Sequence, residues 1–122
     1  MFHLQIEGDF ASAHQLREYK GKCENLHGHN WRVLVRVCGR KLGPSGMLID
    51  FGVLKAKLRA RLEGLDHQFL NELPPFDVVN PTSENLAKHI FETLDADLPD
   101  GVGMHEVRVW ESEKSAASYM RD

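Results

Sequence analysis

The strongest chemical signal in the sequence is the triplet His27-Gly28-His29, which opens a valine-rich stretch. Alternate residues of a β-strand point to the same side and lie about 6.6 Å apart, at roughly 3.3 Å per residue. Two imidazoles at this spacing can bind one metal ion, and His14 can reach the same ion if its own stretch pairs with this one as a hairpin. Three histidines with an open fourth position are typical of a catalytic zinc site. The residues therefore predict that His14, His27 and His29 bind Zn²⁺, with a chance cluster of surface histidines as the alternative.

Cys23 is the second candidate for chemistry, because it lies four residues before His27. A thiol so close to a metal site is either a fourth ligand, which makes the site structural, or a base or nucleophile beside a substrate. Nearby Lys20 and Lys22 favour the thiolate form. A small buried hydrophobic side chain is the third interpretation. The neighbouring histidines favour a functional Cys23, whereas the buried interpretation is preferred for Cys38.

Two acidic residues stand where a carboxylate could serve a reaction. Asp66 directly precedes His67, and an aspartate beside a histidine can orient the imidazole for proton transfer. A polar turn after a helix is the alternative for this pair. Glu111 ends the apolar row of Val107 and Val109, so its carboxylate needs a partner or a ligand. It can accept two hydrogen bonds from the N–H and amino groups of a fused heterocycle, unless it is simply a solvated strand end.

Alternation of apolar and polar residues with a period of two predicts four strands. These strands are residues 2–7 (continuing to His14 unless Gly8 and Asp9 form a bulge), 27–38, 104–111 and 115–120. A long loop is predicted over 15–26. The short apolar run 47–49 is predicted to end a hairpin arm.

Apolar residues at helical spacing predict two helices. The first begins after Asp50 as its N-cap and ends at Gly64, and the second begins with Pro81 and Thr82. Their predicted buried faces are Leu54, Leu58 and Leu62 in the first helix and Leu86, Ile90, Phe91 and Leu94 in the second.

The element order ββααββ predicts an α+β fold, in which a four-stranded antiparallel sheet carries both helices on one face. A chain of 122 residues has the size of one domain, taken as residues 1–122. The other face of the sheet is expected to carry aromatic and branched side chains. A monomer would leave that face in water, so we expect an oligomer.

The composition narrows the function classes. Lys and Arg number 15 against 18 Asp and Glu, and the net charge of −3 argues against nucleic-acid or lipid binding driven by bulk charge. The first residues do not read as a signal peptide, and no apolar run nears the roughly 20 residues of a membrane span. Two cysteines are too few for a disulfide framework. We expect a cytoplasmic enzyme or a small binding module, with no nucleic-acid or membrane partner.

Together these motifs resemble the 6-pyruvoyltetrahydropterin synthase family, and within it the bacterial carboxy-forming branch of queuosine biosynthesis. Five segments carry the resemblance over nearly the whole chain: Phe10-Ala11-Ser12-Ala13-His14, Cys23-Glu24-Asn25-Leu26-His27-Gly28-His29, Leu65-Asp66-His67, Pro81-Thr82-Ser83-Glu84-Asn85 and Glu111. The three residues between Cys23 and His27 resemble the bacterial branch, whereas animal pyruvoyl-forming enzymes typically carry a longer insertion. A cysteine at position 23, in place of a glutamate, argues against the branch that makes a pterin by aldolase-like cleavage. The segment 112–122 departs from the family pattern.

The resemblance implies the tunnelling fold, in which the sheets of several subunits join into a barrel with the helices outside and active sites between subunits. Members are usually hexamers built from paired trimers. The residue roles that it implies are zinc ligands (His14, His27, His29), catalytic residues (Cys23 as base, Asp66 and His67 as the proton-donating pair) and substrate-binding residues (Glu111, Thr82, Ser83).

The implied reaction converts 7,8-dihydroneopterin triphosphate to 6-carboxytetrahydropterin with release of acetaldehyde and triphosphate. It needs no redox cofactor, because the electrons come from the substrate. The alternative within the fold is 6-pyruvoyl formation, which eliminates triphosphate without breaking a carbon–carbon bond. The alternative from another class is a non-catalytic binding module stabilised by zinc.

Overall fold

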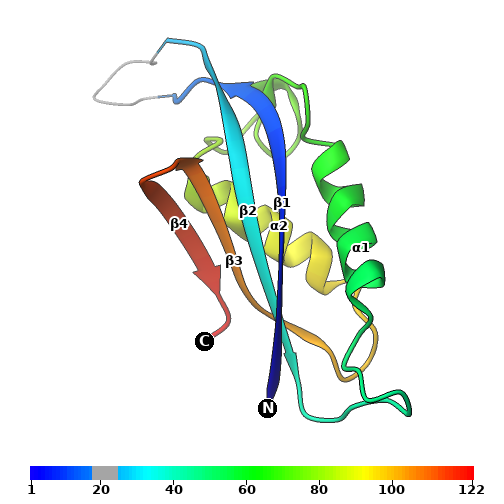
Figure 1. Cartoon of the computed structure of the whole chain (residues 1–122). Helices are drawn as coiled ribbons and strands as arrows, with labels where there is room; N and C mark the ends of the chain where they lie inside the picture. The colour runs from blue at the N-terminus through cyan, green and yellow to red at the C-terminus, as the bar shows by residue number, and fades with distance from the viewer. Residues whose placement is uncertain (18–24) are drawn as a thin grey trace.

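Four antiparallel strands and two α-helices make up the computed structural model, which describes residues 1–17 and 25–122 (Figure 1). The strands lie in the order β1-β2-β3-β4 and each pair is antiparallel. The elements are β1 (Phe2–His14), β2 (His27–Gly39), α1 (Phe51–Glu63), the short 3₁₀ helix η1 (Leu70–Glu72), α2 (Ser83–Asp95), β3 (Gly103–Ser112) and β4 (Ser115–Met120). The predicted ββααββ order and the antiparallel sheet are confirmed.

β1 and β2 form one unbroken ladder. It runs from Phe2 opposite Gly39 to His14 opposite His27 without a register shift. The bulge considered at residues 8–9 is therefore absent, and side chains of even number in β1 keep to one face as far as His14. This register is what brings His14 beside His27.

Side-chain caps set the start of both helices. Asp50 Oδ1 accepts hydrogen bonds from two backbone N–H groups in the first turn of α1, at 2.7 and 3.2 Å, as predicted for its N-cap. The Thr82 hydroxyl accepts one from the N–H of Asn85 at 3.1 Å, so Thr82 is the N-cap of α2. α2 therefore begins at Ser83, and the prediction that Pro81 opens it is wrong.

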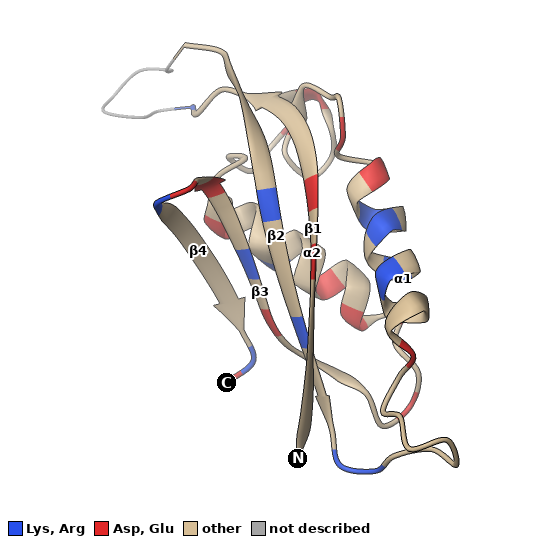
Figure 2. Ribbon diagram, in the orientation of Figure 1, with Lys and Arg blue, Asp and Glu red and all other residues tan. Residues whose placement is uncertain are grey.

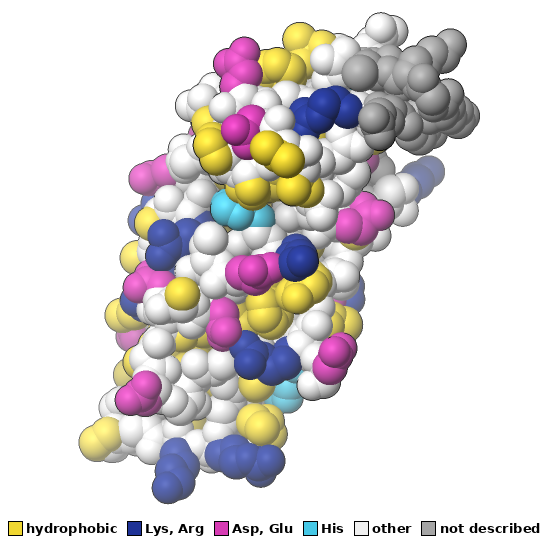
Figure 3. Space-filling view, turned by 180° about the vertical axis from the view of Figure 1, so that it is seen from behind, with side chains coloured by type: hydrophobic (Ala, Val, Ile, Leu, Met, Phe, Trp, Pro, Cys, Tyr) yellow, Lys and Arg dark blue, Asp and Glu magenta, His cyan; other side chains and the backbone are white. Residues whose placement is uncertain are grey.

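Both helices pack on the same face of the sheet, α1 beside β1 and α2 against β3 and β4. The predicted helix faces are buried: Leu54, Leu58 and Leu62 of α1, and Leu86, Ile90, Phe91 and Leu94 of α2. They form one core with the β2 row of Trp31, Val33, Val35 and Val37. The outside of this helical side mixes charged and apolar groups (Figure 3). Within the described residues, neither helix has the length and apolar character needed to span a membrane.

The segment 40–50 contradicts one prediction. Residues 47–49 do not end a hairpin arm, because the whole segment is an irregular connection from β2 to α1. The N–H of Gly43 donates to the Met47 carbonyl at 2.9 Å, which closes a tight turn. Ile49 then enters the core, whereas Met47 is exposed. A run of three apolar residues has no period, so it cannot distinguish a strand from a loop that crosses between layers.

The open face of the sheet is mostly polar, although Leu34 of β2 and Trp110 of β3 lie on it, so the expectation of aromatic and branched side chains there is confirmed only in part. Figure 2 shows charged residues at intervals along β1, β2 and β3. Glu106 of β3 is only 1% exposed and accepts hydrogen bonds from the Ser118 hydroxyl and Arg108 Nη2, both at 2.8 Å, with Arg36 Nη1 at 3.5 Å. Burial alone would raise the pKa of Glu106. The Ser118 hydroxyl and the two guanidinium groups outweigh it, so the pKa lies below its ordinary value.

We expect Glu106→Gln to lower the free energy of unfolding by about 2 kcal/mol near pH 7, because hydrogen bonds to charged groups contribute roughly 1.5–3 kcal/mol. The folded-state pKa of Glu106 is below its unfolded value of 4.5, so the carboxylate stabilises the fold above that pH. This contribution is lost as the pH falls through the folded pKa. Urea unfolding of both proteins from about pH 7 to pH 3 should therefore show the difference shrinking. A constant difference would contradict the assignment.

Candidate metal centre

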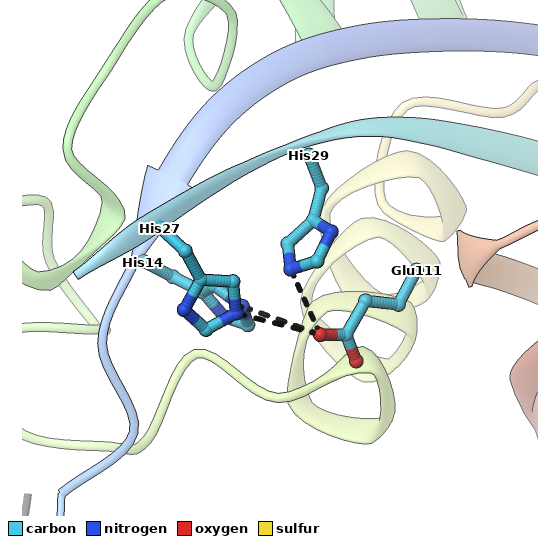
Figure 4. A group of neighbouring side chains, drawn as sticks. All are labelled: His14, His27, His29 and Glu111. Carbon is cyan, nitrogen blue, oxygen red and sulfur yellow. Dashed lines mark hydrogen bonds and ion pairs between the residues drawn. The ribbon is translucent and has the colours of Figure 1, made fainter. Parts of the chain in front are cut away.

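Four side chains from three strands point at one another at one end of the sheet (Figure 4). The ligand atoms of His14, His27, His29 and Glu111 all lie within 4.8 Å of one another. Glu111 Oε1 lies 2.9 Å from His29 Nε2, 3.5 Å from His14 Nε2 and 3.8 Å from His27 Nε2. Imidazole and carboxylate are ligands that zinc and similar divalent ions accept. This metal cluster could therefore hold an ion.

The strand registers explain why these side chains meet. His14 and His27 are directly opposite in the β1–β2 ladder, and His29 lies two residues along β2 on the same face. Glu111 extends the core-facing row of β3, the next strand of the sheet. Trp31 packs beneath the imidazoles, with ring centres 4.9 Å from His14 and 5.3 Å from His29. His14 is buried, whereas the side chains of His27 and Glu111 are 36% and 37% exposed, so the cluster opens to solvent on one side.

Hydrogen bonds behind the imidazoles decide which nitrogen faces the cluster. His14 Nδ1 lies 2.8 Å from the Pro81 carbonyl oxygen, and His27 Nδ1 lies 2.8 Å from that of Asn25. A carbonyl oxygen can only accept, so each Nδ1 carries hydrogen and each neutral ring keeps its lone pair on Nε2. The two Nε2 atoms face each other at 3.1 Å. A proton on one Nε2 or a metal ion between the two relieves the repulsion of lone pairs at this distance, and carbonyls behind the rings are the usual support for metal-binding histidines. The residues present therefore fit a bound metal ion.

Asp66 and His67 lie at the outer edge of β1, outside the metal cluster. Asp66 Oδ1 accepts a hydrogen bond from the N–H of Ala11 at 2.8 Å, and Asp66 Oδ2 lies 2.9 Å from His67 Nδ1. The bond from Ala11, followed by the contact with His67, holds the pKa of Asp66 below its ordinary value. The ionised carboxylate orients an imidazole whose side chain is 81% exposed. One open hollow of the surface is lined by both His67 and His29.

The remaining predicted site residues are Cys23, Thr82 and Ser83. Cys23 lies in 18–24, outside the described residues. Thr82 uses its hydroxyl to cap α2, and Ser83 is buried at the start of the helix. The segment that contains them contacts the cluster through the carbonyl of Pro81, which accepts the hydrogen bond from His14.

Three features of the site are not visible in the sequence pattern. Every residue has a carbonyl, so nothing marks the one of Pro81 as the partner of His14. The sequence pattern places Trp31 in the core-facing row of β2. It does not show that the Trp31 ring also packs against the imidazoles of His14 and His29. The position of Glu111 beside the histidines depends on the register of β2 with β3, in which Arg32 lies opposite Trp110. The apolar row that ends at Glu111 was the only signal for its placement.

Comparison with known proteins agrees with this fold. The family model for 6-pyruvoyl tetrahydropterin synthase matches residues 3–122. A 6-carboxy-5,6,7,8-tetrahydropterin synthase from Synechocystis sp. is 41% identical over 125 residues, which cover 98% of this chain and 93% of the relative. The 6-pyruvoyl tetrahydrobiopterin synthase from Homo sapiens is 35% identical, over 94% of this chain and 81% of the relative. The structure of 6-pyruvoyl tetrahydropterin synthase from Caenorhabditis elegans matches with a TM-score of 0.85 at 29% identity, over 99% of this chain and 96% of the other. The chain therefore belongs to the 6-pyruvoyl tetrahydropterin synthase family.

Proposed function

We propose that this protein is a zinc-dependent carbon–carbon lyase of queuosine biosynthesis. Its proposed reaction converts 7,8-dihydroneopterin triphosphate and water to 6-carboxytetrahydropterin, acetaldehyde and triphosphate. The observation that carries the proposal is the metal cluster, in a chain 41% identical to a 6-carboxy-5,6,7,8-tetrahydropterin synthase. Zinc bound by the three imidazoles supplies a Lewis acid that makes the hydroxyl groups of the substrate's side chain more acidic.

The protein's own side chains move the protons. Cys23, as a thiolate, takes a C–H proton from the side chain of the substrate. His67, held at Nδ1 by Asp66, exchanges a proton at its other ring nitrogen. These proton shifts transfer an electron pair from the side chain to the ring, which changes from dihydropterin to tetrahydropterin. Triphosphate leaves, and water enters as the bond between the first and second side-chain carbons breaks.

The remaining predicted residues bind the pterin ring. Glu111 accepts hydrogen bonds from the N–H and amino groups of the pyrimidine edge. Its carboxylate is 37% exposed, so one oxygen can face a ligand in the open side of the cluster. Thr82 and Ser83 contribute through their backbone, because the Thr82 hydroxyl already caps α2.

Two other functions compete with this proposal. The relative from Homo sapiens, at 35% identity, is named for 6-pyruvoyl formation, which would use the same cluster. The three residues between Cys23 and His27 favour the carboxy-forming reaction instead. A non-catalytic zinc module predicts a closed site, whereas the side chains of His27 and Glu111 are more than one-third exposed.

We further propose a cytoplasmic homo-oligomer, a hexamer of two trimers whose sheets join into barrels. β1 and β4 are the outer strands of the sheet, and outer strands of this kind pair readily with another chain. His67 lies at the β1 edge, so pairing there would place it against a neighbouring subunit and form active sites between subunits.

The function is tested by supplying zinc-loaded protein with 7,8-dihydroneopterin triphosphate and trapping aldehydes. We expect acetaldehyde and triphosphate in equal amounts, together with 6-carboxytetrahydropterin. Triphosphate without acetaldehyde would assign the protein to the pyruvoyl-forming branch. Zinc binding without turnover of this substrate would refute the proposed reaction while leaving the metal site intact.

Cys23→Ala should abolish turnover and leave zinc binding unchanged, because the three imidazole ligands remain. Cys38→Ala is the matched control, since this free thiol lies in β2 and takes no part in the proposed chemistry. It should keep both zinc and activity. Metal analysis and the aldehyde assay measure the two effects, and loss of zinc from Cys23→Ala would make Cys23 a ligand and contradict its role as base.

Glu111→Gln separates substrate recognition from metal binding. We expect KM to rise at least about tenfold, because the amide is a neutral acceptor and its NH2 group would face the N–H and amino donors of the pterin. Zinc content should stay at the wild-type level. His29→Ala is the comparison, and it should lose zinc because it removes an imidazole. Zinc loss of equal size in both variants would show that Glu111 is a metal ligand.

A further inference from the structure

Two asparagine side chains continue the pairing of β1 beyond its last residue. Asn71 Oδ1 accepts a hydrogen bond from the N–H of Gln15 at 2.8 Å, and its Nδ2 donates to the Gln15 carbonyl at 2.7 Å. Asn80 makes the same two bonds to Arg17, at 2.7 and 2.8 Å. Each pair of bonds, here called an amide clasp, replaces the residue that a neighbouring strand would supply. The chain after His14 is thereby tied to the connection between α1 and α2.

Asn80 is fixed at its backbone as well as at its side chain. Its carbonyl accepts hydrogen bonds from the N–H of Thr82 and from Nδ2 of Asn85, both at 2.9 Å. The guanidinium of Arg17 also donates to the Val79 carbonyl at 3.0 Å, which adds a further bond between Arg17 and the segment that contains Asn80. These bonds leave the backbone at Asn80 little freedom to move.

Pro81 lies between Asn80 and the N-cap of α2. The proline ring locks φ near −65°, so the direction of the Pro81 carbonyl follows from the position of its two neighbours. His14 Nδ1 donates to this carbonyl at 2.8 Å. The direction in which His14 presents Nε2 to the cluster therefore depends on a carbonyl that Asn80 holds in place.

We infer that Asn80 is a positioning residue for the metal centre, which acts through the Pro81 carbonyl on the tautomer and orientation of His14. The inference rests on the proposed metal site and is independent of the reaction catalysed there. Hydrogen-bond partners of metal-binding histidines typically contribute ten- to hundred-fold to metal affinity. Asn80 acts one step behind such a partner.

Asn80→Ala and Asn71→Ala form a matched pair for the test, because each removes one amide clasp of two hydrogen bonds. Zinc affinity is measured by competition with a chromogenic chelator, and the melting temperature is measured without metal. We expect Asn80→Ala to weaken zinc binding about tenfold and Asn71→Ala by less than about threefold. The melting temperatures should fall by similar amounts.

Proton NMR of the zinc-loaded proteins supplies a second readout. The Nδ1 proton of His14 should exchange slowly with water in the wild type and in Asn71→Ala, because it is buried and bound to the Pro81 carbonyl. It should exchange faster in Asn80→Ala. The Nδ1 proton of His27, bound to the Asn25 carbonyl, is the internal reference and should not change.

Unchanged zinc affinity in Asn80→Ala, or equal losses in the two variants, would overturn the inference. If Asn80→Ala does not fold, Asn85→Ala replaces it, because it removes only one bond to the Asn80 carbonyl. A loss of about threefold is then expected, and unchanged affinity would again overturn the inference. A wild-type protein that binds no zinc would instead refute the proposed metal site.

Discussion

The register of the β1–β2 ladder is the constraint on which the rest of the site depends. A shift of one residue would turn His14 to the open face and separate it from His27 and His29. Two independent features hold the observed register. On one face, the apolar row packs against the helices, and on the other, Glu7 Oε1 lies 2.7 Å from Arg32 Nε across the same two strands. The observed pairing satisfies both the core and this ion pair, and it also fixes the positions of the three histidines.

The connection between α1 and α2 supplies hydrogen-bond partners to the residues of β1 that form the site. It supplies the Pro81 carbonyl behind His14 and the Asp66 carboxylate that binds the N–H of Ala11. A buried imidazole that points its lone pair at another lone pair costs free energy. The carbonyl bond offsets part of that cost, and a cation in the cluster would offset the rest. The cost of two facing lone pairs therefore favours metal binding by the three histidines over the same cluster without an ion.

Periodicity and capping signals predicted most of the fold. The alternating stretches became β1 to β4, and Asp50 caps α1 as its side chain indicates. Residues 47–49 were misjudged because three apolar residues carry no period. The expectation of an aromatic and branched open face is confirmed only in part, because alternation says which residues share a face, not that a buried Glu106 binds two arginines there. For the site, the spacing of His27 and His29 indicated a shared ligand direction, but the contact with Glu111 depends on the register of β2 against β3, which pairs Arg32 with Trp110 and which no local pattern reports.

The metal cluster and the Asp66–His67 pair are both attached to β1. His14 belongs to β1, and Asp66 is bound to the β1 residue Ala11, so their relative position is as rigid as the ladder. Cys23 lies on the connection from His14 to His27, in the segment 18–24 outside the described residues. The length of that connection is where the sequence resembles the carboxy-forming branch. We therefore expect this connection to decide between the two reactions, because it sets the distance between the Cys23 thiol and the metal cluster.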